Sequence, residues 1–335
     1  MELKRQVNGL SESAVILLAM ALLAACVPPE TEQPLDQVTV KLKWVHQAQF
    51  AGMYVAAEKG FYKDQNLEVN LVPFSFEEPT LESVVEGKAV FGVKSASEIV
   101  QARAEGLPVR AFAVIYQDSP LCCYSLKGSG ITSPQDFPGR TVGLKPGQIT
   151  IAYQVMLNKL GIDRNTITEV PIGYGVEELI GGTTDVSTGF SINEPHQVIE
   201  AGYEVNIMLF ADYGVKVYDD VLFATEDTIN NNPELVERFL RATLAGWRYA
   251  IQHEDEAVDM VLEYATDRTR THEAYVLRQS IPLIHTGGSP IGWMERERWV
   301  HTHDVLLEAG AIEKGIDVDE VFTMQFLTQI YGHME

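Results

Sequence analysis

Strands and helices alternate along this chain from residue 38 onward, and this alternation limits the fold more than any other feature. Apolar and polar side chains alternate over residues 38–44, which is typical of a strand. Aromatic and small residues then recur at helical spacing over 50–57, and Gly60 ends that helix. A second strand is predicted at 67–72. Because a strand, a helix and a strand in this order build parallel sheets, the sequence predicts an α/β fold.

The same alternation continues to residue 201, and the pattern then changes. Further strands are predicted at 90–93, 109–114, 121–126, 141–144, 168–170 and 186–190, and helices at 82–86, 97–104, 151–160 and 197–201. From Asn232-Pro233 onward the apolar residues follow the helical period, and Pro233 suits a first helical turn. Doubly wound sheets bind ligands at the carboxyl ends of their strands. With two such halves, the cleft between them is the natural site.

Composition narrows the class of partner. The chain has 335 residues, which is enough for two domains of ordinary size. Its formal net charge is −22, with 25 Lys and Arg against 47 Asp and Glu. Binding to nucleic acid or to an anionic membrane surface needs clustered basic residues. We therefore expect neither as a partner.

The N-terminus has the pattern of an export signal. Lys4 and Arg5 precede an uncharged apolar run over residues 14–25, which is too short to span a bilayer comfortably. The run ends in Leu-Ala-Ala-Cys at 23–26, which resembles the bacterial lipobox, in which the cysteine is diacylated and becomes the new N-terminus.

Three segments are therefore expected before the folded part. Residues 1–25 are a signal peptide, Cys26 is the lipidation site, and 26–37, rich in Pro, Glu, Gln and Thr, form a polar tether. The alternative is a plain cleaved signal with an incidental cysteine. In both cases the protein is exported, and with lipidation it is anchored to the outer face of the cell membrane.

Spacing alone indicates no metal site, cofactor or catalytic set. Cys122 and Cys123 are adjacent, and neighbouring cysteines rarely bridge because the peptide between them distorts. No nearby His completes a metal set with them. His301 and His303 point to different faces of a predicted helix. The sequence thus predicts a protein that is not an enzyme.

Four stretches resemble one protein family. Residues 41–74, KLKWVHQAQFAGMYVAAEKGFYKDQNLEVNLVPF, look like the opening of the solute-binding proteins related to yeast thiamine-pyrimidine synthase. Residues 91–117, 128–147 and 211–250 match later parts of the same family in the right order. That superfamily also holds bacterial binders of thiamine precursors, alkanesulfonates and riboflavin.

The resemblance implies a two-lobed periplasmic-binding-protein (type II) fold with the ligand cleft between the lobes. Lobe 1 would comprise residues 37–125 plus 222–335, and lobe 2 residues 126–221. It also implies a solute-binding lipoprotein that delivers a small molecule to a membrane permease of an ABC importer.

Departures from the family pattern indicate which members of the family this chain resembles most. The yeast-type synthase has a cysteine-rich iron motif where this chain has residues 218–223, and a His within the stretch matching 93–97; neither is present here. Thiamine-pyrimidine binders usually carry Trp-x-Pro-Asn where this chain has Trp44-Val45-His46-Gln47. The form HQAQFAG at 46–52 is closest to the riboflavin branch.

The resemblance therefore favours a planar nitrogen heterocycle, with riboflavin first. The alternative ligand is a thiamine pyrimidine precursor of the hydroxymethylpyrimidine or formylaminopyrimidine type. A sulfonate or nitrate would need a more cationic cleft than the sequence shows. A pyrimidine-synthase-like enzyme is the alternative from another class.

Candidate ligand contacts are aromatic and polar residues at predicted strand ends and loops. A planar heterocycle needs flat apolar faces around it and a few polar partners. The candidates are the aromatic residues Trp44, Phe50, Tyr116, Tyr174 and Tyr213, and the polar residues Gln47, Gln49, Ser95, Asn193 and Glu194. For the aromatic residues the alternative is core packing. For Ser95 and Asn193 it is helix capping.

Overall fold

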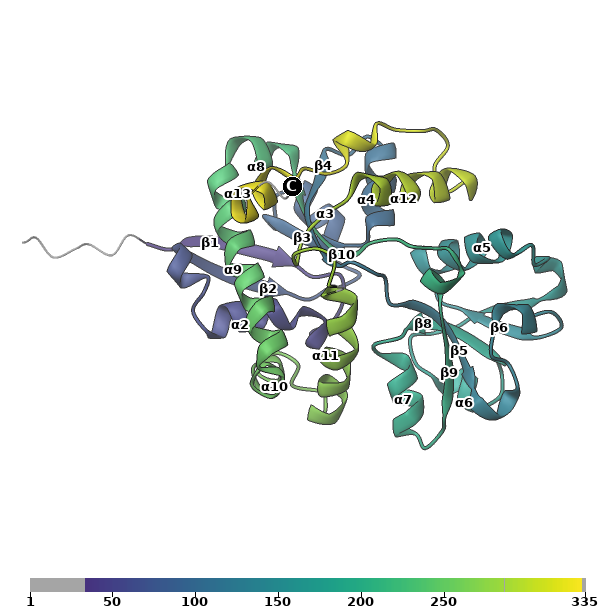
Figure 1. Ribbon diagram of the computed structural model, residues 1–335. Coiled ribbons are helices and arrows are strands. Elements are labelled where there is room, and N and C mark those ends of the chain that lie inside the picture. The colour runs from purple at the N-terminus through teal and green to yellow at the C-terminus, as the bar shows by residue number, and fades with distance from the viewer. Residues whose placement is uncertain (1–33, 286, 333–335) are drawn as a thin grey trace, which may run out of the picture. The chain divides into compact units, whose positions relative to one another are not determined.

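The chain folds into two five-stranded sheets, and both are mixed rather than purely parallel (Figure 1). This computed structural model describes residues 34–285 and 287–332. The predicted signal peptide at 1–25, Cys26 and most of the 26–37 tether lie outside the described residues. The residues from Asp36 onward form one compact unit.

The first sheet has the spatial order β2 (Leu67–Val72), β1 (Asp36–Lys41), β3 (Phe91–Lys94), β10 (Asp219–Thr225) and β4 (Val109–Tyr116). β1 is parallel to β2 and β3, as the strand–helix–strand order predicts. β10 is antiparallel to both β3 and β4. The expectation of a parallel sheet is therefore wrong for the strand that returns late in the sequence.

The second sheet repeats this plan. Its order is β7 (Thr168–Pro171), β6 (Thr141–Leu144), β8 (Val186–Phe190), β5 (Leu121–Leu126) and β9 (Val205–Leu209). β6 is parallel to β7 and β8, and β5 is antiparallel to β8 and β9. The strands β9 and β10 have no counterpart among the predicted strands.

The chain crosses between the sheets twice. β5 lies in the second sheet and β10 in the first, so the crossings fall at residues 117–120 and 210–218. These positions precede the boundaries expected at 125/126 and 221/222. The division into two lobes with those boundaries stays a prediction.

Helices accompany both sheets. Along the first sheet's part of the chain run α2 (Ala51–Glu58), α3 (Thr80–Val85), α4 (Ala96–Ala104), α8 (Glu226–Asn231), α9 (Pro233–Gln252), α10 (Glu254–Leu262), α11 (Arg270–Ile284), α12 (Arg296–Glu308) and α13 (Gln325–Tyr331). The second sheet has α5 (Gln148–Leu160), α6 (Glu177–Ile180) and α7 (Glu194–Glu200). Single 3₁₀ turns are η1 (Ala48–Phe50), η2 (Lys63–Gln65), η3 (Lys127–Ser129), η4 (Pro134–Asp136), η5 (Arg164–Thr166), η6 (Phe210–Tyr213) and η7 (Val318–Glu320). No helix within residues 34–285 and 287–332 is both long and apolar enough to cross a membrane.

The contact between α2 and α9 shows why the first sheet's helices pack closely. α9 begins at Pro233, as predicted, and buries one face that includes Phe239, Leu240 and Trp247. Gly246 of α9 lies directly against the backbone of α2, because a Cβ at this position would overlap the carbonyl oxygen of Gly52. Two helices approach this closely only where one of them lacks a side chain.

The adjacent cysteines lie on β5, which pairs with β8 and β9 in the second sheet. Cys122 and Cys123 on β5 are free and buried, and they face different apolar clusters on the two sides of the sheet. Burial raises the pKa of both thiols well above the ordinary value. Both therefore serve as small apolar side chains.

Candidate functional site

A cavity lies where the carboxyl ends of strands from both sheets meet. Its empty space is about 940 Å³, counted to the mouth that opens to solvent. From the first sheet it is lined by residues that follow β1 and β2 and end β3; from the second, by residues that follow β6 and β7 and end β8. This is the place where doubly wound sheets bind ligands.

Aromatic rings form much of the cavity wall. Trp44 follows β1 and Tyr174 follows β7, and their ring centroids are 5.0 Å apart with planes tilted by 58°. Phe74 and Phe190, both partly buried, add two further rings to the lining. Because Trp44 and Tyr174 belong to different sheets, a flat ligand that packs against both rings would contact both halves of the molecule at once.

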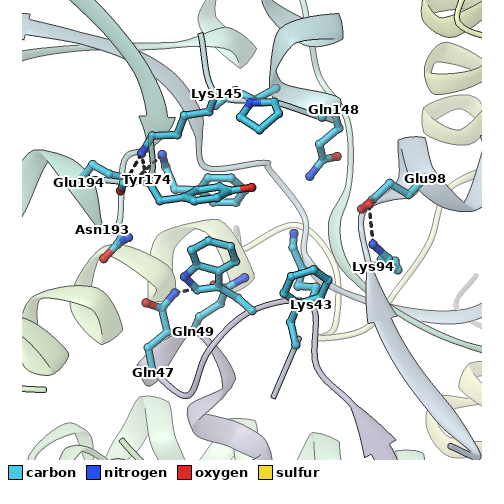
Figure 2. Close-up of a pocket in the computed structure, with 16 residues that line it drawn as sticks. Lys43, Gln47, Gln49, Lys94, Glu98, Lys145, Gln148, Tyr174, Asn193 and Glu194 are labelled. Carbon is cyan, nitrogen blue, oxygen red and sulfur yellow. Dashed lines mark hydrogen bonds and ion pairs between the residues drawn. The ribbon is translucent and has the colours of Figure 1, made fainter. Parts of the chain in front are cut away.

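Side-chain amides supply the polar part of the lining. The Gln47 amide donates to Gln49 Oε1 at 2.6 Å, and the Gln49 amide donates to Asp220 at 2.7 Å. The Gln47 and Gln148 carbonyl oxygens are buried and accept no hydrogen bond from the protein. A buried acceptor without a donor costs about 1–3 kcal/mol. Two such acceptors on one cavity favour a ligand that brings N–H or O–H donors (Figure 2).

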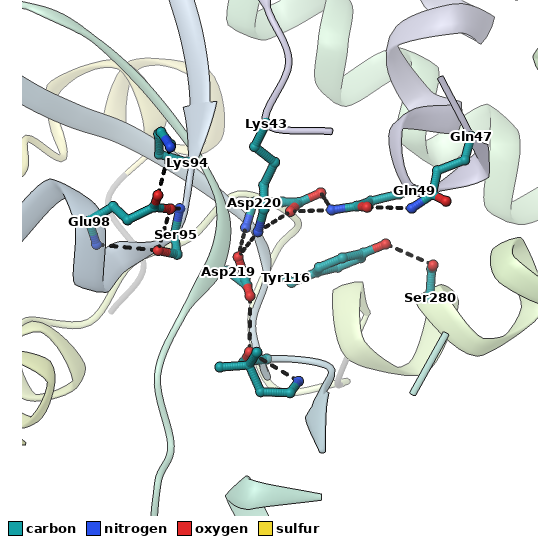
Figure 3. Close-up of polar contacts among 12 residues, drawn as sticks. Lys43, Gln47, Gln49, Lys94, Ser95, Glu98, Tyr116, Asp219, Asp220 and Ser280 are labelled. Atoms are coloured by element: carbon teal, nitrogen blue, oxygen red, sulfur yellow. Dashed lines mark hydrogen bonds and ion pairs between the residues drawn. The ribbon is translucent and has the colours of Figure 1, made fainter. Parts of the chain in front are cut away.

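The amides connect through Asp220 to a buried ion-pair network centred on Lys43 (Figure 3). The Lys43 ammonium contacts Asp219 and lies 3.2 Å from Asp220. Asp219 also accepts a hydrogen bond from the Ser119 hydroxyl at 3.0 Å. Burial raises the pKa of Asp220 to about 7, with Lys43 opposing and Asp219 reinforcing the shift. For Lys43, burial alone would lower the pKa, but the two aspartates together raise it.

The other lysines of the lining are paired as well. Lys145 forms an ion pair with Glu194, with both side chains buried, and donates to the Tyr174 carbonyl oxygen at 3.2 Å. Lys94 lies 2.6 Å from Glu98. Burial would raise the pKa of Glu98, but the charge of Lys94 lowers it overall. Each of the three lysines that line the cavity thus has a carboxylate partner, and the partners of Lys43 lie behind the lining.

Residues 47–257 match the family described as "NMT1/THI5 like". The chain belongs to the NMT1/THI5-like family.

The relatives of this chain carry different functional names. The chain is 28% identical to "Riboflavin-binding protein RibY" of Chloroflexus aurantiacus, over 90% of this chain and 89% of that protein. It is 26% identical to "Formylaminopyrimidine-binding protein" of Halalkalibacterium halodurans, over 87% and 93%. It is also 28% identical to "4-amino-5-hydroxymethyl-2-methylpyrimidine phosphate synthase" of Legionella pneumophila, over 87% and 92%.

Solved structures give the fold of this NMT1/THI5-like chain. The putative sulfonate-binding protein SsuA of Methylobacillus flagellatus superposes with a TM-score of 0.68 at 18% identity, covering 89% of this chain and 94% of that one. A Candida albicans protein described as having the generic periplasmic binding protein fold gives 0.62 at 14% identity, covering 87% and 98%. The predicted α/β periplasmic-binding-protein fold is therefore confirmed.

Six of the ten predicted ligand contacts line the cavity of this family member. They are Trp44, Gln47, Gln49, Tyr174, Asn193 and Glu194. The Asn193 side chain does not cap α7; its carbonyl oxygen instead lies 3.0 Å from His272 Nε2 and 3.3 Å from the Gln197 amide. Helix capping, the alternative role, therefore does not explain Asn193. Contact of the six residues with a ligand stays a prediction.

The other four predicted contacts do not line the cavity. Phe50 is buried in the core of the first sheet, and the buried Tyr116 hydroxyl donates to Ser280 at 2.7 Å. Ser95 caps α4 in a reciprocal arrangement with Glu98. Tyr213 packs on the apolar cluster of the second sheet. Core packing or capping is thus observed at these four positions, and their contact with a ligand stays a prediction.

Sequence reasoning missed the three lysines of the cavity lining. Lys43, Lys94 and Lys145 have partners far away in sequence or on another element, so their positions could not be weighed from spacing. Of the three, only Lys145 lies in a turn that the sequence could indicate as a ligand site, since this turn follows a strand and precedes a helix.

Glu273 of α11 supports the segment that carries Gln47 and Gln49. Its carboxylate accepts a hydrogen bond from the backbone N–H of Ala48 at 2.5 Å, while its second oxygen is buried without a partner. Burial raises the pKa of Glu273 to about 7. The folded protein therefore holds a proton on this group at pH values where the unfolded chain has released it.

Glu273→Gln should thus stabilise the protein increasingly as the pH rises. Between about pH 4.5 and 7 the wild type loses stability, because folding keeps a proton that the unfolded chain gives up; above pH 7 the loss is constant. The glutamine does not titrate, so its advantage should grow to about 1–3 kcal/mol by pH 8. Urea denaturation at pH 5 and pH 8 measures this, with Glu77→Gln at an exposed position as control. Equal effects at both pH values would contradict the assignment.

Proposed function

We propose that this protein is an extracytoplasmic solute-binding protein of an ABC importer and that its cavity holds a planar nitrogen heterocycle, with riboflavin as the preferred ligand. The observation that carries the proposal is the pairing of Trp44 and Tyr174 from different sheets above amides with unused acceptors. The names of two binding relatives support the same ligand class.

The charge balance of the cavity favours riboflavin over anionic ligands. Each lysine of the lining has a carboxylate partner, so a sulfonate or nitrate would have to compete with Asp219, Glu98 or Glu194 for its cation. Riboflavin is uncharged, and its ring system offers an imide N–H to a buried carbonyl acceptor such as that of Gln47. A ligand held by groups from both sheets would stabilise one arrangement of the two, which a permease can recognise.

A thiamine pyrimidine precursor is the second candidate. The relative named for formylaminopyrimidine binding covers nearly the whole chain. A pyrimidine also has a flat ring and exocyclic N–H donors, so the same wall and amides would serve it.

An enzymatic role is the alternative from another class, since several relatives are named as pyrimidine phosphate synthases. Against it, residues 218–223 provide two buried aspartates and no thiol, and both aspartates are occupied by Lys43. Release of a pyrimidine product in a turnover assay with added iron or pyridoxal phosphate would favour the enzyme.

Titration of the purified protein with riboflavin should quench flavin fluorescence at micromolar concentrations, because stacking on aromatic side chains quenches the ring. Trp44→Ala should weaken binding at least about 30-fold, corresponding to about 2 kcal/mol for a central aromatic contact. Tyr203→Ala, a partly exposed aromatic outside the cavity lining, is the matched control. No quenching in the wild type would exclude riboflavin, and displacement by formylaminopyrimidine would identify the second candidate as a competitor.

We further propose that Cys26, which lies outside the described residues, carries the lipid anchor. Acyl chains hold a protein at a membrane through the burial of their CH₂ groups. Cys26→Ser should move the protein from the membrane fraction to the soluble extracytoplasmic fraction. Intact-mass measurement checks the assignment, since the wild type should carry the added mass of the lipid. An unmodified cysteine in the mature chain would contradict it.

A further inference from the structure

Two imidazoles and a carboxylate converge next to the cavity, in a group that none of the roles above uses. His196 and Glu200 lie one turn apart on α7, and His272 lies in the first turn of α11. The Nδ1 atoms of the two histidines are 3.1 Å apart. A Glu200 carboxylate oxygen is 3.8 Å from His196 Nδ1 and 3.6 Å from His272 Nδ1. The two histidines are 76 residues apart in sequence, so no spacing pattern could reveal them.

These three separations fit the coordination sphere of a small transition-metal ion. A circle through three atoms at such distances has a radius of about 2.0 Å, which is the length of a Zn–N or Zn–O bond. An ion slightly out of the plane of the three atoms would therefore bond to each without moving them far. Two imidazoles and one carboxylate are a ligand set that zinc accepts, with a fourth position left for water.

Neighbouring side chains orient both imidazoles for metal binding. His272 Nε2 lies 3.0 Å from the Asn193 carbonyl oxygen, so this nitrogen carries the proton and Nδ1 keeps its lone pair. Such a hydrogen bond to the far nitrogen is the usual support of a metal-ligating histidine. The His196 ring stacks on Tyr275 with centroids 4.1 Å apart, which fixes its plane.

The group is open to solvent on one side. The histidines are buried, whereas the Glu200 side chain is 40% exposed. An ion can therefore reach the group from solvent along Glu200.

We propose that His196, Glu200 and His272 bind one divalent transition-metal ion of the zinc type, which links α7 to α11 beside the ligand cavity. α7 follows β8 of the second sheet, while α11 packs on β4 of the first sheet and on η1. The ion would fasten the two sheets together at one side of the cavity. It would also hold Asn193, a lining residue, through the His272 hydrogen bond.

The test is a cobalt(II) titration of the metal-free protein without a polyhistidine tag. One equivalent of Co²⁺ should give the intense visible absorption of a four-coordinate site, and Zn²⁺ should displace it. Glu200→Gln and His272→Gln should each weaken Zn²⁺ binding by roughly 10- to 100-fold or more, since even outer partners of metal ligands have effects of this size. His285→Gln, at an exposed histidine, should leave it unchanged.

A second readout separates loss of the site from loss of the fold. Zn²⁺ should raise the melting temperature of the wild type and of His285→Gln, and should not raise that of Glu200→Gln, whose exposed side chain can change without unfolding the protein. The proposal is overturned if Co²⁺ gives no four-coordinate spectrum, or if Glu200→Gln binds Zn²⁺ like the wild type. Neither measurement uses riboflavin, so the outcome is independent of the proposed function.

Discussion

Lys43→Met should lower the free energy of unfolding by about 3–5 kcal/mol, because it leaves two buried carboxylates without their cation. Asp219 and Asp220 are almost fully buried, and Lys43 is the ammonium group that contacts both. Methionine has nearly the length of lysine, so the loss reflects charge rather than volume. Binding should weaken too, since Asp220 orients Gln49 and Gln49 orients Gln47 (Figure 3).

The loss in Lys43→Met should be larger at pH 8 than at pH 5. Without the lysine the folded protein must keep a proton on the aspartate pair that the unfolded chain releases above about pH 4. Denaturant titration at both pH values measures the difference. Lys88→Met removes an exposed ion pair with Glu86 and should cost less than about 1 kcal/mol. If the double variant Lys43→Met with Asp219→Asn were no more stable than Lys43→Met, unpaired charge would not be the cause.

Gly246→Ala should destabilise the protein by about 3 kcal/mol or more, although alanine favours helices over glycine by about 1 kcal/mol. The added Cβ would overlap the carbonyl oxygen of Gly52 and lie 2.9 Å from the Ala56 Cβ. These atoms belong to the backbone and the first side-chain atom of α2, so α9 must move away from α2 as a unit.

Gly128→Ala provides the matched control for that substitution. A Cβ at Gly128 meets open space, and the change should alter stability by less than about 0.5 kcal/mol. Urea denaturation of both variants gives the comparison. If Gly246→Ala were as stable as the wild type, the close approach of α2 and α9 would be wrong.

Local sequence pattern was sufficient to predict some elements of the fold and not others. β1, β2 and α9 were predictable because apolar residues recur with one clear period. β10 was not, because it opens with Asp219-Asp220, which in isolation is typical of a turn. These aspartates enter a buried strand only because Lys43, 176 residues away from Asp219, compensates them. Such compensation between distant residues leaves no trace in local periodicity.

The residues of the candidate site were likewise predictable only in part. Trp44, Tyr174 and Asn193 follow strand ends, and the general location of ligands in α/β folds made them candidates. Ser95 and Tyr116 occupy similar places, but their side chains turn to a helix cap and to Ser280. The direction of a side chain at a strand end depends on the strand's pairing partners, and β10 was one of the missing partners.

The position of β10 between β3 and β4 also dictates an order of assembly. β3 and β4 are not neighbours; both pair with a strand that is synthesised about a hundred residues later, after the whole second sheet. As the chain emerges, the second sheet has all its strands while β3 and β4 still expose unpaired edges. A chain stopped before residue 219 would keep those edges open and prone to aggregate.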